Sequence, residues 1–490
     1  MMPVWGEITA GDILASIKGT LLSGRPDAPL GEISTDSRKI GHGQMFLALK
    51  GEQFDGHAFI SQAIKQGACG FIIQRDYPAD SALYSPGPGA PEMLVIKVDD
   101  TQTALGDLAA WWRRQHRVRV AAITGSAGKT STKEMTSSVL GQRTLKNPGN
   151  FNNLIGLPLT LLGLQKVHRN AVLEMGMNRP GEIARLTEIA APDVGLITNV
   201  GVAHTEGLGD IEGVARAKWE LVERISNKGK IVLNGDDLML RRLASGSERE
   251  VIFFGLGSGN DVRAVGIQDL GLNGVRFDLE HRGRNWAVSL EVPGIQNVLN
   301  SLAAASVALC FNESIEHIIE GLSRFRGVEG RFSVRRLPGE VLLVDDTYNS
   351  NPLSLKAALA AVKSLAVERG RLIIGLAEMM ELGDVAETAH LEAGRMVADL
   401  CPRYFFAMGN HAVEMIKGAV SAGLAPERAQ ETASYEEMLQ RIKEETRQGG
   451  LVFLKGSRRM GLERVVKGLT NHEIREEAYY GNDEKNTGCR

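Results

Sequence analysis

The segment Val120-Ala-Ala-Ile-Thr-Gly-Ser-Ala-Gly-Lys-Thr-Ser131 decides the fold class of this chain. It begins as an apolar strand, runs into a loop with two glycines, and continues through Lys-Thr into a helix-compatible stretch. Gly125 and Gly128 let the backbone curl so that successive N–H groups face one phosphate. We expect Lys129 to reach the terminal phosphates of a nucleotide and the Thr130 hydroxyl to hold Mg²⁺. The helix N-terminus adds favourable positive partial charge.

This loop is shorter than the general phosphate-binding pattern, which needs a glycine where Ile123 stands. A plain glycine turn is therefore the alternative interpretation. The combination of strand, loop, Lys-Thr and helix favours phosphate binding, and the remaining positions Ser126, Ala127 and Ser131 are expected to belong to the same cradle.

Length and composition bound the rest of the chain. A chain of 490 residues, 43% of them hydrophobic and 23% charged, indicates a globular protein of about three domains. The net charge of -3 gives no global reason to bind nucleic acid or an anionic membrane. The four cysteines lie far apart, which disfavours a zinc site or a disulfide scaffold. Since no apolar run approaches ~20 residues and the first thirty residues do not read as a signal peptide, we expect a cytoplasmic protein without membrane insertion.

Apolar runs that alternate with helix-compatible segments predict an α/β protein with mostly parallel sheets. Residues 1–100 resemble a small mixed α/β domain, with a surface loop at Ser85–Pro91. A helix at 101–116 opens a central α/β domain, 101–327. Residues 328–470 read as a second, smaller, Rossmann-like α/β domain, and 471–490 as a frayed tail.

Several polar residues follow later strands or lie on helices. Glu174 ends one strand and His204 follows another, so both could converge on a Mg²⁺-triphosphate at the carboxyl edge of a parallel sheet. A solvated turn Glu and a structural His are the alternatives. Lys218, by position alone, reads as a surface lysine. Asn297 and Asn300 share one helix face, where paired amides suit adenine or ribose, although Asn at a helix start is also a common cap.

In order along the chain, these motifs resemble the Mur ligase family of ATP-dependent amide ligases over about residues 33–466. The segments that carry the resemblance are Thr124–Thr130, Asn147–Pro158, Glu174–Asn178, Asn199–His204, Ala217–Glu220, Asn297–Asn300 and Gly330-Arg331. The ordered set is far more specific than any one motif.

Within the family, the chain is most similar to the members that add D-alanyl-D-alanine to UDP-N-acetylmuramoyl-tripeptide. Asp345-Asp-Thr-Tyr-Asn-Ser-Asn-Pro352 and Leu454-Lys-Gly-Ser-Arg458 carry this choice, and Ser34-Thr-Asp-Ser-Arg38 resembles the family's UDP-binding domain. The segment Ala377-Glu-Met-Met-Glu-Leu-Gly383 departs from the usual Gly-Asp-Met pattern, which puts the local loop geometry in doubt.

The resemblance implies a reaction and its cofactors. ATP activates the substrate carboxylate as an acyl phosphate, and the incoming amine then displaces phosphate to form the amide. Two Mg²⁺ ions are implied, one held by Thr130 and Glu174 and the second served by His204 and Lys218. Because an ammonium cannot ligate a cation, Lys218 is expected to carry a carbamate formed with CO₂. Lys129, Lys218 and His204 are the implied catalytic residues.

The resemblance also implies the binding residues. Arg331 would reach the phosphates, with an interdomain salt bridge as its alternative, and Asp346 would reach the ribose. The implied contacts with the UDP and peptide substrates are Ser34, Thr35, Asp36, Ser37, Arg38, Asn150, Asn152, Asn153, Tyr348 and Asn349. The partners are UDP-N-acetylmuramoyl-tripeptide and D-alanyl-D-alanine, with no nucleic acid, and the protein is expected to be a monomer.

Four alternatives stay open at this point. They are the Mur-type ligase of the preceding, tripeptide-forming step, a folylpolyglutamate-type ligase, a P-loop phosphotransferase and a non-catalytic nucleotide-binding scaffold. The UDP-type segment in front argues against the folylpolyglutamate-type ligase. The full set of expected metal ligands argues against the scaffold.

Overall fold

The computed structural model describes residues 5, 7–51, 54–78, 93–203, 205–365 and 371–470. They form two compact units. The first comprises Met1–Ile123, Leu140–Gly195 and Glu220–Lys230, and the second Thr124–Val139, Leu196–Trp219 and Ile231–Arg490. The predicted loop at Ser85–Pro91 and the predicted tail at 471–490 lie outside the described residues. The boundaries of the three predicted domains remain a prediction.

The first unit opens with a small α/β layer. Its sheet has the order β2-β7-β6-β5-β4, in which β4 to β7 are parallel and β2 is antiparallel. The elements are β1 (Ile8–Thr9), α1 (Ala10–Ile17), β2 (Thr20–Ser23), β3 (Pro29–Leu30), β4 (Ile33–Ser34), β5 (Met45–Leu47), α2 (Ile60–Lys65), β6 (Gly70–Gln74) and β7 (Leu94–Val98). Phe46, Phe71 and Val95 belong to its buried core.

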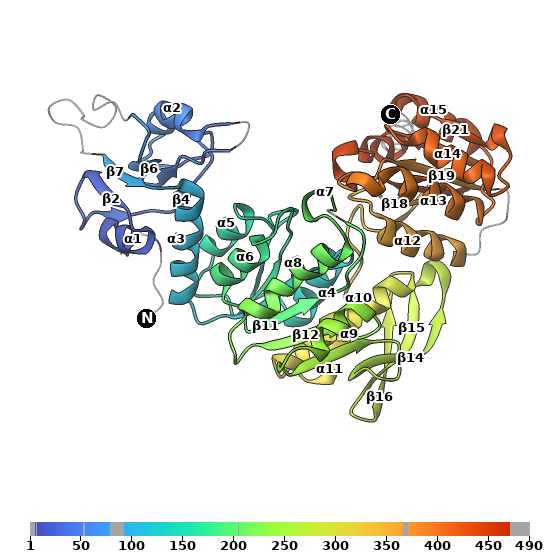
Figure 1. Ribbon diagram of the computed structural model, residues 1–490, viewed down its shortest axis with the longest axis horizontal. Helices are drawn as coiled ribbons and strands as arrows, with labels where there is room; N and C mark the ends of the chain where they lie inside the picture. Colours follow the sequence, from blue (N-terminus) through green and yellow to red (C-terminus); the bar gives the residue numbers. More distant parts are fainter. Residues whose placement is uncertain are drawn as a thin grey trace, which may run out of the picture. The chain divides into compact units, whose positions relative to one another are not determined.

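Helix α3 (Thr101–Gln115) confirms the helix predicted at 101–116. Its N-cap, Asp100, accepts a hydrogen bond from Thr103 N, and two arginines in the last turn suit the negative helix end. The helix packs on α5 (Gly156–Leu162) and α6 (Glu182–Ala190), and Figure 1 shows these helices together. Beside them, β8 (Arg119–Thr124), β10 (Asn170–Glu174) and β9 (Thr144–Lys146) pair in parallel.

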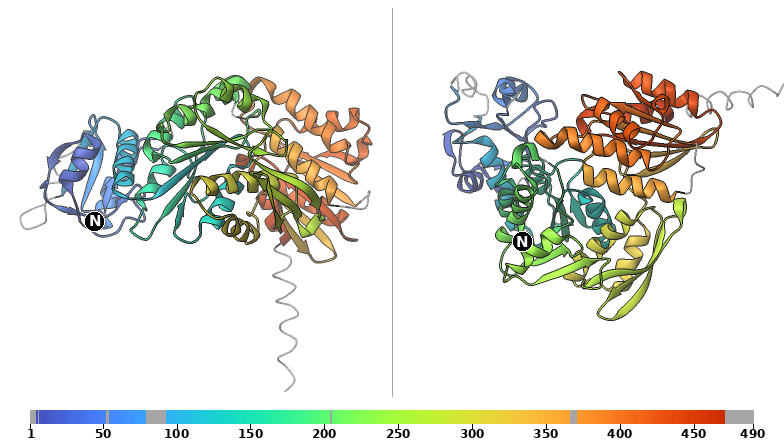
Figure 2. Two further views of the ribbon diagram at one scale, coloured as in Figure 1. Left: turned by 90° about the horizontal axis from the view of Figure 1, so that it is seen from below. Right: turned by 45° about the vertical axis from the view of Figure 1, so that its right-hand side comes forward.

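The second unit contains the phosphate loop and the later strands. Strands β12 (Lys230–Asn234), β13 (Val251–Gly255) and β14 (Val262–Asp269) are parallel, whereas β15 (Val275–His281) and β16 (Arg284–Leu290) continue antiparallel. Helix α10 (Ile295–Cys310) packs on β13, β14 and β15 (Figures 1 and 2). Other elements are α4 (Lys129–Leu140), β11 (Val194–Ile197), α7 (Thr205–Leu208), α8 (Ile211–Arg224), α9 (Leu238–Ser245) and α11 (Ile315–Ser323).

The same unit ends in a six-stranded sheet of order β17-β18-β22-β19-β20-β21, parallel except for β17. The strands are β17 (Ser333–Leu337), β18 (Val341–Asp346), β19 (Leu372–Ala377), β20 (Tyr404–Met408), β21 (Ala429–Glu431) and β22 (Gly450–Lys455). The helices are α12 (Pro352–Ser364), α13 (Ala386–Ala398), α14 (Ala412–Ser421) and α15 (Tyr435–Glu445).

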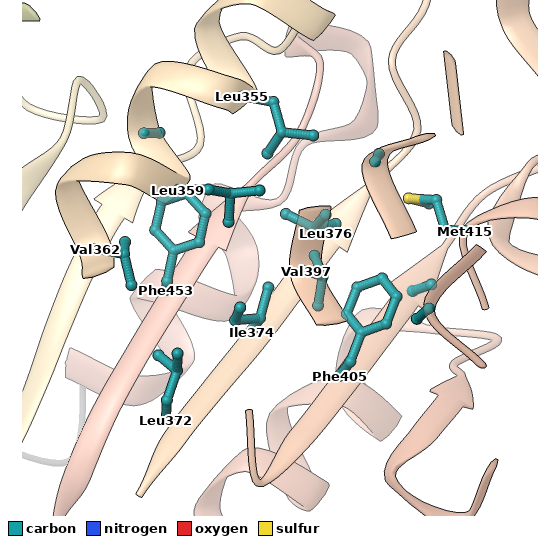
Figure 3. Close-up of a cluster of buried hydrophobic side chains, with 14 of the residues drawn as sticks. Leu355, Leu359, Val362, Leu372, Ile374, Leu376, Val397, Phe405, Met415 and Phe453 are labelled. Carbon is teal, nitrogen blue, oxygen red and sulfur yellow. The ribbon is translucent and has the colours of Figure 1, made fainter. Parts of the chain in front are cut away.

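Both faces of this sheet are buried, as the continuous apolar runs of a parallel sheet predict. Alternate residues of each strand enter opposite cores, because successive strand side chains point to opposite faces. Figure 3 shows one core, where Leu372, Ile374 and Leu376 of β19 and Phe453 of β22 meet α12. Ile373 belongs to the opposite core, which includes residues of α15. The α/β fold class is therefore confirmed, and no helix in the described ranges has the length and apolar character to span a bilayer.

Candidate functional site

The phosphate loop has the backbone shape that its two glycines predicted. Gly125 has φ +150° and Gly128 has φ +83°. A Cβ at Gly125 would overlap the Thr198 hydroxyl, and a Cβ at Gly128 would overlap the Asn300 side chain. Only glycine therefore fits at both positions. The loop leads directly into α4, whose first residue is Lys129.

Neighbouring strand ends hold this loop from one side. Asn199 accepts from Ala127 N at 2.8 Å through its Oδ1, and its Nδ2 donates to Ala127 O at 3.1 Å. Thr198 Oγ1 donates to the same carbonyl at 2.6 Å. The Ser126 hydroxyl donates to Gly201 O and accepts from Gly201 N, both at 2.9 Å. Hydrogen bonds from the neighbouring segment thus fix the backbone of the loop.

Two lysines lie at this loop. Lys129 Nζ donates to Gly125 O at 2.7 Å. Lys218, on α8, is 1% exposed, so its interpretation as a surface lysine is wrong. Burial, and secondly the charge of Lys129, hold the pKa of Lys218 well below its ordinary value. Among the described residues, no hydrogen bond or ion pair engages the Lys218 Nζ.

Arg331 lies at the same loop from the C-terminal part of the unit. Its Nη2 donates to Thr130 Oγ1 at 2.9 Å, and its guanidinium lies 4.0 Å from the centre of the Tyr348 ring. The Arg458 guanidinium lies 5.3 Å from the same ring. Two cations therefore meet one aromatic ring beside the predicted phosphate site, where anionic ligands would be favoured.

Asp346 forms a buried ion pair. Lys455 Nζ donates to Asp346 Oδ2 at 2.6 Å and to Asn349 O at 3.0 Å, while Phe332 N donates to Asp346 Oδ1 at 3.0 Å. Burial is the main influence on both groups: it raises the pKa of Asp346 and lowers the pKa of Lys455. The pair fixes the chain on both sides of Tyr348 and next to Arg331.

The two helix asparagines have different surroundings. Asn300 accepts from Thr132 Oγ1 at 3.3 Å and lies against Gly128, so it is part of the phosphate-loop wall. Asn297 Nδ2 donates to Pro293 O at 2.8 Å, at the start of its own helix. Both are nearly buried.

In the first unit, Glu174 lies in a network of asparagines. Asn147 accepts from Glu174 N at 2.9 Å and donates to Glu174 O at 2.8 Å. Asn152 Nδ2 donates to Glu174 Oε1 at 2.8 Å. Asn153 Oδ1 instead accepts from Gly156 N at the start of α5, and Asn150 is exposed. Glu174 is therefore a buried, oriented carboxylate and not a solvated turn residue.

The segment Ser34–Arg38 forms a turn built around Asp36. Arg38, whose side chain is 77% exposed, binds the Asp36 carboxylate through two nitrogens, at 2.9 and 3.0 Å. These hydrogen bonds lower the pKa of Asp36 to about 2. Ser34 Oγ accepts from Asp36 N, whereas Ser37 points to Gln62 and is buried. Thr35 is partly exposed between them.

His204 lies outside the described residues, but its neighbour is anchored. Thr205 Oγ1 donates to Leu382 O at 2.8 Å, in the segment that departs from the family pattern. Ala377 ends β19, and the non-glycine residue with positive φ there is Glu381, at 65°. Alanine can therefore replace the family's usual glycine at position 377, because this position needs no left-handed backbone.

Some side chains that organise the site were not predicted as site residues. They are Asn147, Asn199, Asn351 and Lys455. All four lie in or beside the segments that carried the resemblance, and this placement was the available signal. In the described part of the chain, no group of three or more His, Cys, Asp or Glu side chains is placed to hold a metal ion.

Three family models match the chain in order. The description "Mur ligase family, catalytic domain" matches residues 30–113, "Mur ligase middle domain" matches 123–308, and "Mur ligase, glutamate ligase domain" matches 330–458. Together they cover both the phosphate loop and the C-terminal sheet.

Individual relatives match over nearly their whole length. The UDP-N-acetylmuramoyl-tripeptide–D-alanyl-D-alanine ligase of Bacillus subtilis (strain 168) is 35% identical over 467 residues, 94% of this chain and 98% of that protein. A crystal structure of MurF from Acinetobacter baumannii is 32% identical with a TM-score of 0.84, covering 94% of this chain and 98% of that one. MurF from Thermotoga maritima in complex with ADP is 27% identical with a TM-score of 0.77, covering 91% and 98%.

Proposed function

This chain belongs to the Mur ligase family, and from that premise we infer that it joins D-alanyl-D-alanine to UDP-N-acetylmuramoyl-tripeptide at the expense of ATP. The observation that carries this function is the similarity to ligases of that name across 94% of the chain. The reaction is a step of peptidoglycan precursor synthesis. The phosphate loop, formed and held as described above, is the part of the site that serves ATP.

The chemistry requires an anionic carboxylate to approach an anionic phosphate. We assign Lys129, Arg331 and the N-terminus of α4 to offset that repulsion, because preorganised cations and dipoles stabilise the charge that develops in transfer. The carboxylate of the tripeptide attacks the γ-phosphate and ADP leaves. The amine of D-alanyl-D-alanine then attacks the acyl phosphate, and phosphate leaves as the amide forms.

Two Mg²⁺ ions are part of the proposal, and the donor chemistry fits them. Thr130 and Glu174 supply a hydroxyl and a carboxylate, both nearly buried, and Mg²⁺ prefers oxygen ligands combined with phosphate and water. When bound, the ions would neutralise phosphate charge. His204 and Lys218 are proposed for the second ion.

Lys218 fits a carbamate for a physical reason. Carbamate formation needs a neutral amine, whose lone pair attacks CO₂ with release of one proton. An ordinary lysine is protonated near pH 7, but burial lowers the pKa of Lys218 well below that of such a lysine. The product is an anionic oxygen ligand, which compensates the charge of Lys129 nearby.

We assign the UDP end of the nucleotide substrate to the turn at Ser34–Arg38, with the exposed Arg38 facing its phosphates. Tyr348, Asn349, Asn150, Asn152 and Asn153 are proposed for the peptide substrates. Asn297 and Asn300 are proposed for ATP, with Asp346 toward its ribose. We also propose that the enzyme acts as a monomer in the cytoplasm.

The experiment that tests this function is ADP release with purified protein, ATP and Mg²⁺. UDP-N-acetylmuramoyl-tripeptide and D-alanyl-D-alanine together should give sustained ADP release, and omission of either should abolish it. Sustained release with the dipeptide nucleotide and a single amino acid would instead identify the ligase of the preceding step.

A further inference from the structure

Asn351 connects the C-terminal sheet to the phosphate loop, and we propose that it is a positioning residue for nucleotide binding. The role in nucleotide binding rests on the proposed function, whereas the hydrogen bonds of Asn351 do not depend on it. Asn351 is 8% exposed and follows the strand that carries Asp346. It is the N-cap of α12, with an extended backbone at φ -147° and ψ 167°.

The Asn351 side chain does two things at once. Its Oδ1 accepts from Ser354 N at 2.9 Å, which caps α12, and Ser354 Oγ accepts from Asn351 N at 3.1 Å. Its Nδ2 donates to Ser126 O, in the phosphate loop, at 3.1 Å. Capping needs only an acceptor, which Ser or Asp supplies about as well as Asn. The contact with the loop needs a donor, which among these caps only the amide provides with this reach.

The contact completes the fixation of one peptide group. The peptide between Ser126 and Ala127 has its carbonyl held by Asn351 Nδ2 and its N–H held by Asn199 Oδ1, at 2.8 Å. Rotation of this peptide would redirect the N–H groups that follow, at Gly128 and Lys129. These are the groups expected to face the phosphates.

The contact also lies beside a close approach of the two segments. A Cβ at Gly201 would lie 2.8 Å from Leu353 Cδ2, next to Asn351. The N-terminus of α12 therefore lies directly against the segment around Gly201, which itself holds Ser126 of the phosphate loop. Asn351 supplies the hydrogen bond of this contact. Loss of its amide donor should weaken nucleotide binding without unfolding the sheet.

Two replacements separate positioning from capping. Asn351→Asp keeps an excellent cap but places a carboxylate against the Ser126 carbonyl, and Asn351→Ser keeps a capping hydroxyl but cannot reach that carbonyl. Ser354→Ala is the matched control, because it removes the other half of the capping box and leaves the Asn351 donor intact.

The readout is the affinity for ADP, measured by titration calorimetry on the full chain, together with the unfolding midpoint. We expect both Asn351 variants to weaken ADP binding at least tenfold with an unfolding midpoint close to that of wild type. Ser354→Ala should lower the midpoint slightly and leave ADP affinity unchanged. Because no acceptor substrate is present, the outcome does not depend on the D-alanyl-D-alanine assignment.

Steady-state kinetics add a second measurement. For both Asn351 variants, KM for ATP should rise while KM for the UDP-substrate stays within twofold. Wild-type ADP affinity in Asn351→Asp and Asn351→Ser would overturn the proposal. So would an equal loss of affinity in Ser354→Ala, since that result would assign the effect to the helix cap.

Discussion

Replacing Lys455 by Met should destabilise the C-terminal sheet strongly, although the two side chains have similar length. Lys455 Nζ lies 2.6 Å from Asp346 Oδ2, and the side chains are 2% and 11% exposed. The substitution leaves the Asp346 carboxylate buried without its cation. Breaking a buried pair in this way costs about 3–5 kcal/mol. Because Phe332 N still donates to Asp346, we expect the free energy of unfolding to fall by about 3 kcal/mol.

The stability lost in Lys455→Met should depend on pH through the titration of Asp346. Burial already raises the pKa of Asp346, while the charge of Lys455 opposes that rise. Without Lys455 the pKa of Asp346 should rise further. A carboxyl group whose folded-state pKa lies above its unfolded value stabilises the fold at low pH and loses that contribution as pH rises through the folded pKa. The deficit of Lys455→Met should therefore be larger at pH 8 than at pH 5.

The assay is urea unfolding of wild type, Lys455→Met, Asp346→Asn and the double variant at both pH values. Lys467→Met, the same substitution at an exposed position of the same region, is the control and should stay within about 0.5 kcal/mol. The double variant should be less destabilised than Lys455→Met alone, because it leaves no buried charge. A Lys455→Met deficit under about 1 kcal/mol, or one that does not change with pH, would show that Lys455 does not compensate a buried Asp346 carboxylate.

Three further substitutions test the assigned roles. Lys129→Ala should abolish ligation in a folded protein, since loss of one charge stabiliser costs on the order of 3 kcal/mol in the transition state; more than half of wild-type ADP release would exclude that role. Lys218→Ala should lose most activity and regain part of it when acetate is titrated in, because a small acid can supply the missing oxygen ligand; a variant with near wild-type activity would contradict the assignment. Arg38→Ala should raise KM for the UDP-substrate far more than KM for ATP, and equal changes in both would reduce Arg38 to a structural partner of Asp36.

The sequence predicted most reliably what depends on local pattern. Continuous apolar runs predicted mostly parallel sheets, and strands such as β20 (Tyr404–Met408) consist of such a run, because a strand buried on both faces needs apolar residues throughout. Gly125 and Gly128 were predicted to let the loop backbone curl. Their positive φ angles confirm this, and neighbouring side chains leave no room for a Cβ at either position. In both cases a few consecutive residues contain the whole constraint.

Contacts between segments that lie far apart in the sequence could not be predicted from local patterns. Lys218 lies in a helix of mixed polarity, and only packing decides that this face is buried. Asn351 looked like part of a motif, yet its contact with Ser126 spans 225 positions. Lys455 and Asp346 are 109 positions apart. Polar pairs of this kind follow no sequence periodicity, so the two partners can be identified only from the folded structure.

The mass of the product formed from UDP-N-acetylmuramoyl-tripeptide and ATP tests the proposed ligase reaction directly. The reaction should be given D-alanyl-D-alanine, free D-alanine and free diaminopimelate together, with Mg²⁺ and bicarbonate. We predict one product, the tripeptide nucleotide extended by D-alanyl-D-alanine, with one ADP released for each molecule formed. Addition of a single amino acid, or ADP release without any extended nucleotide, would contradict it.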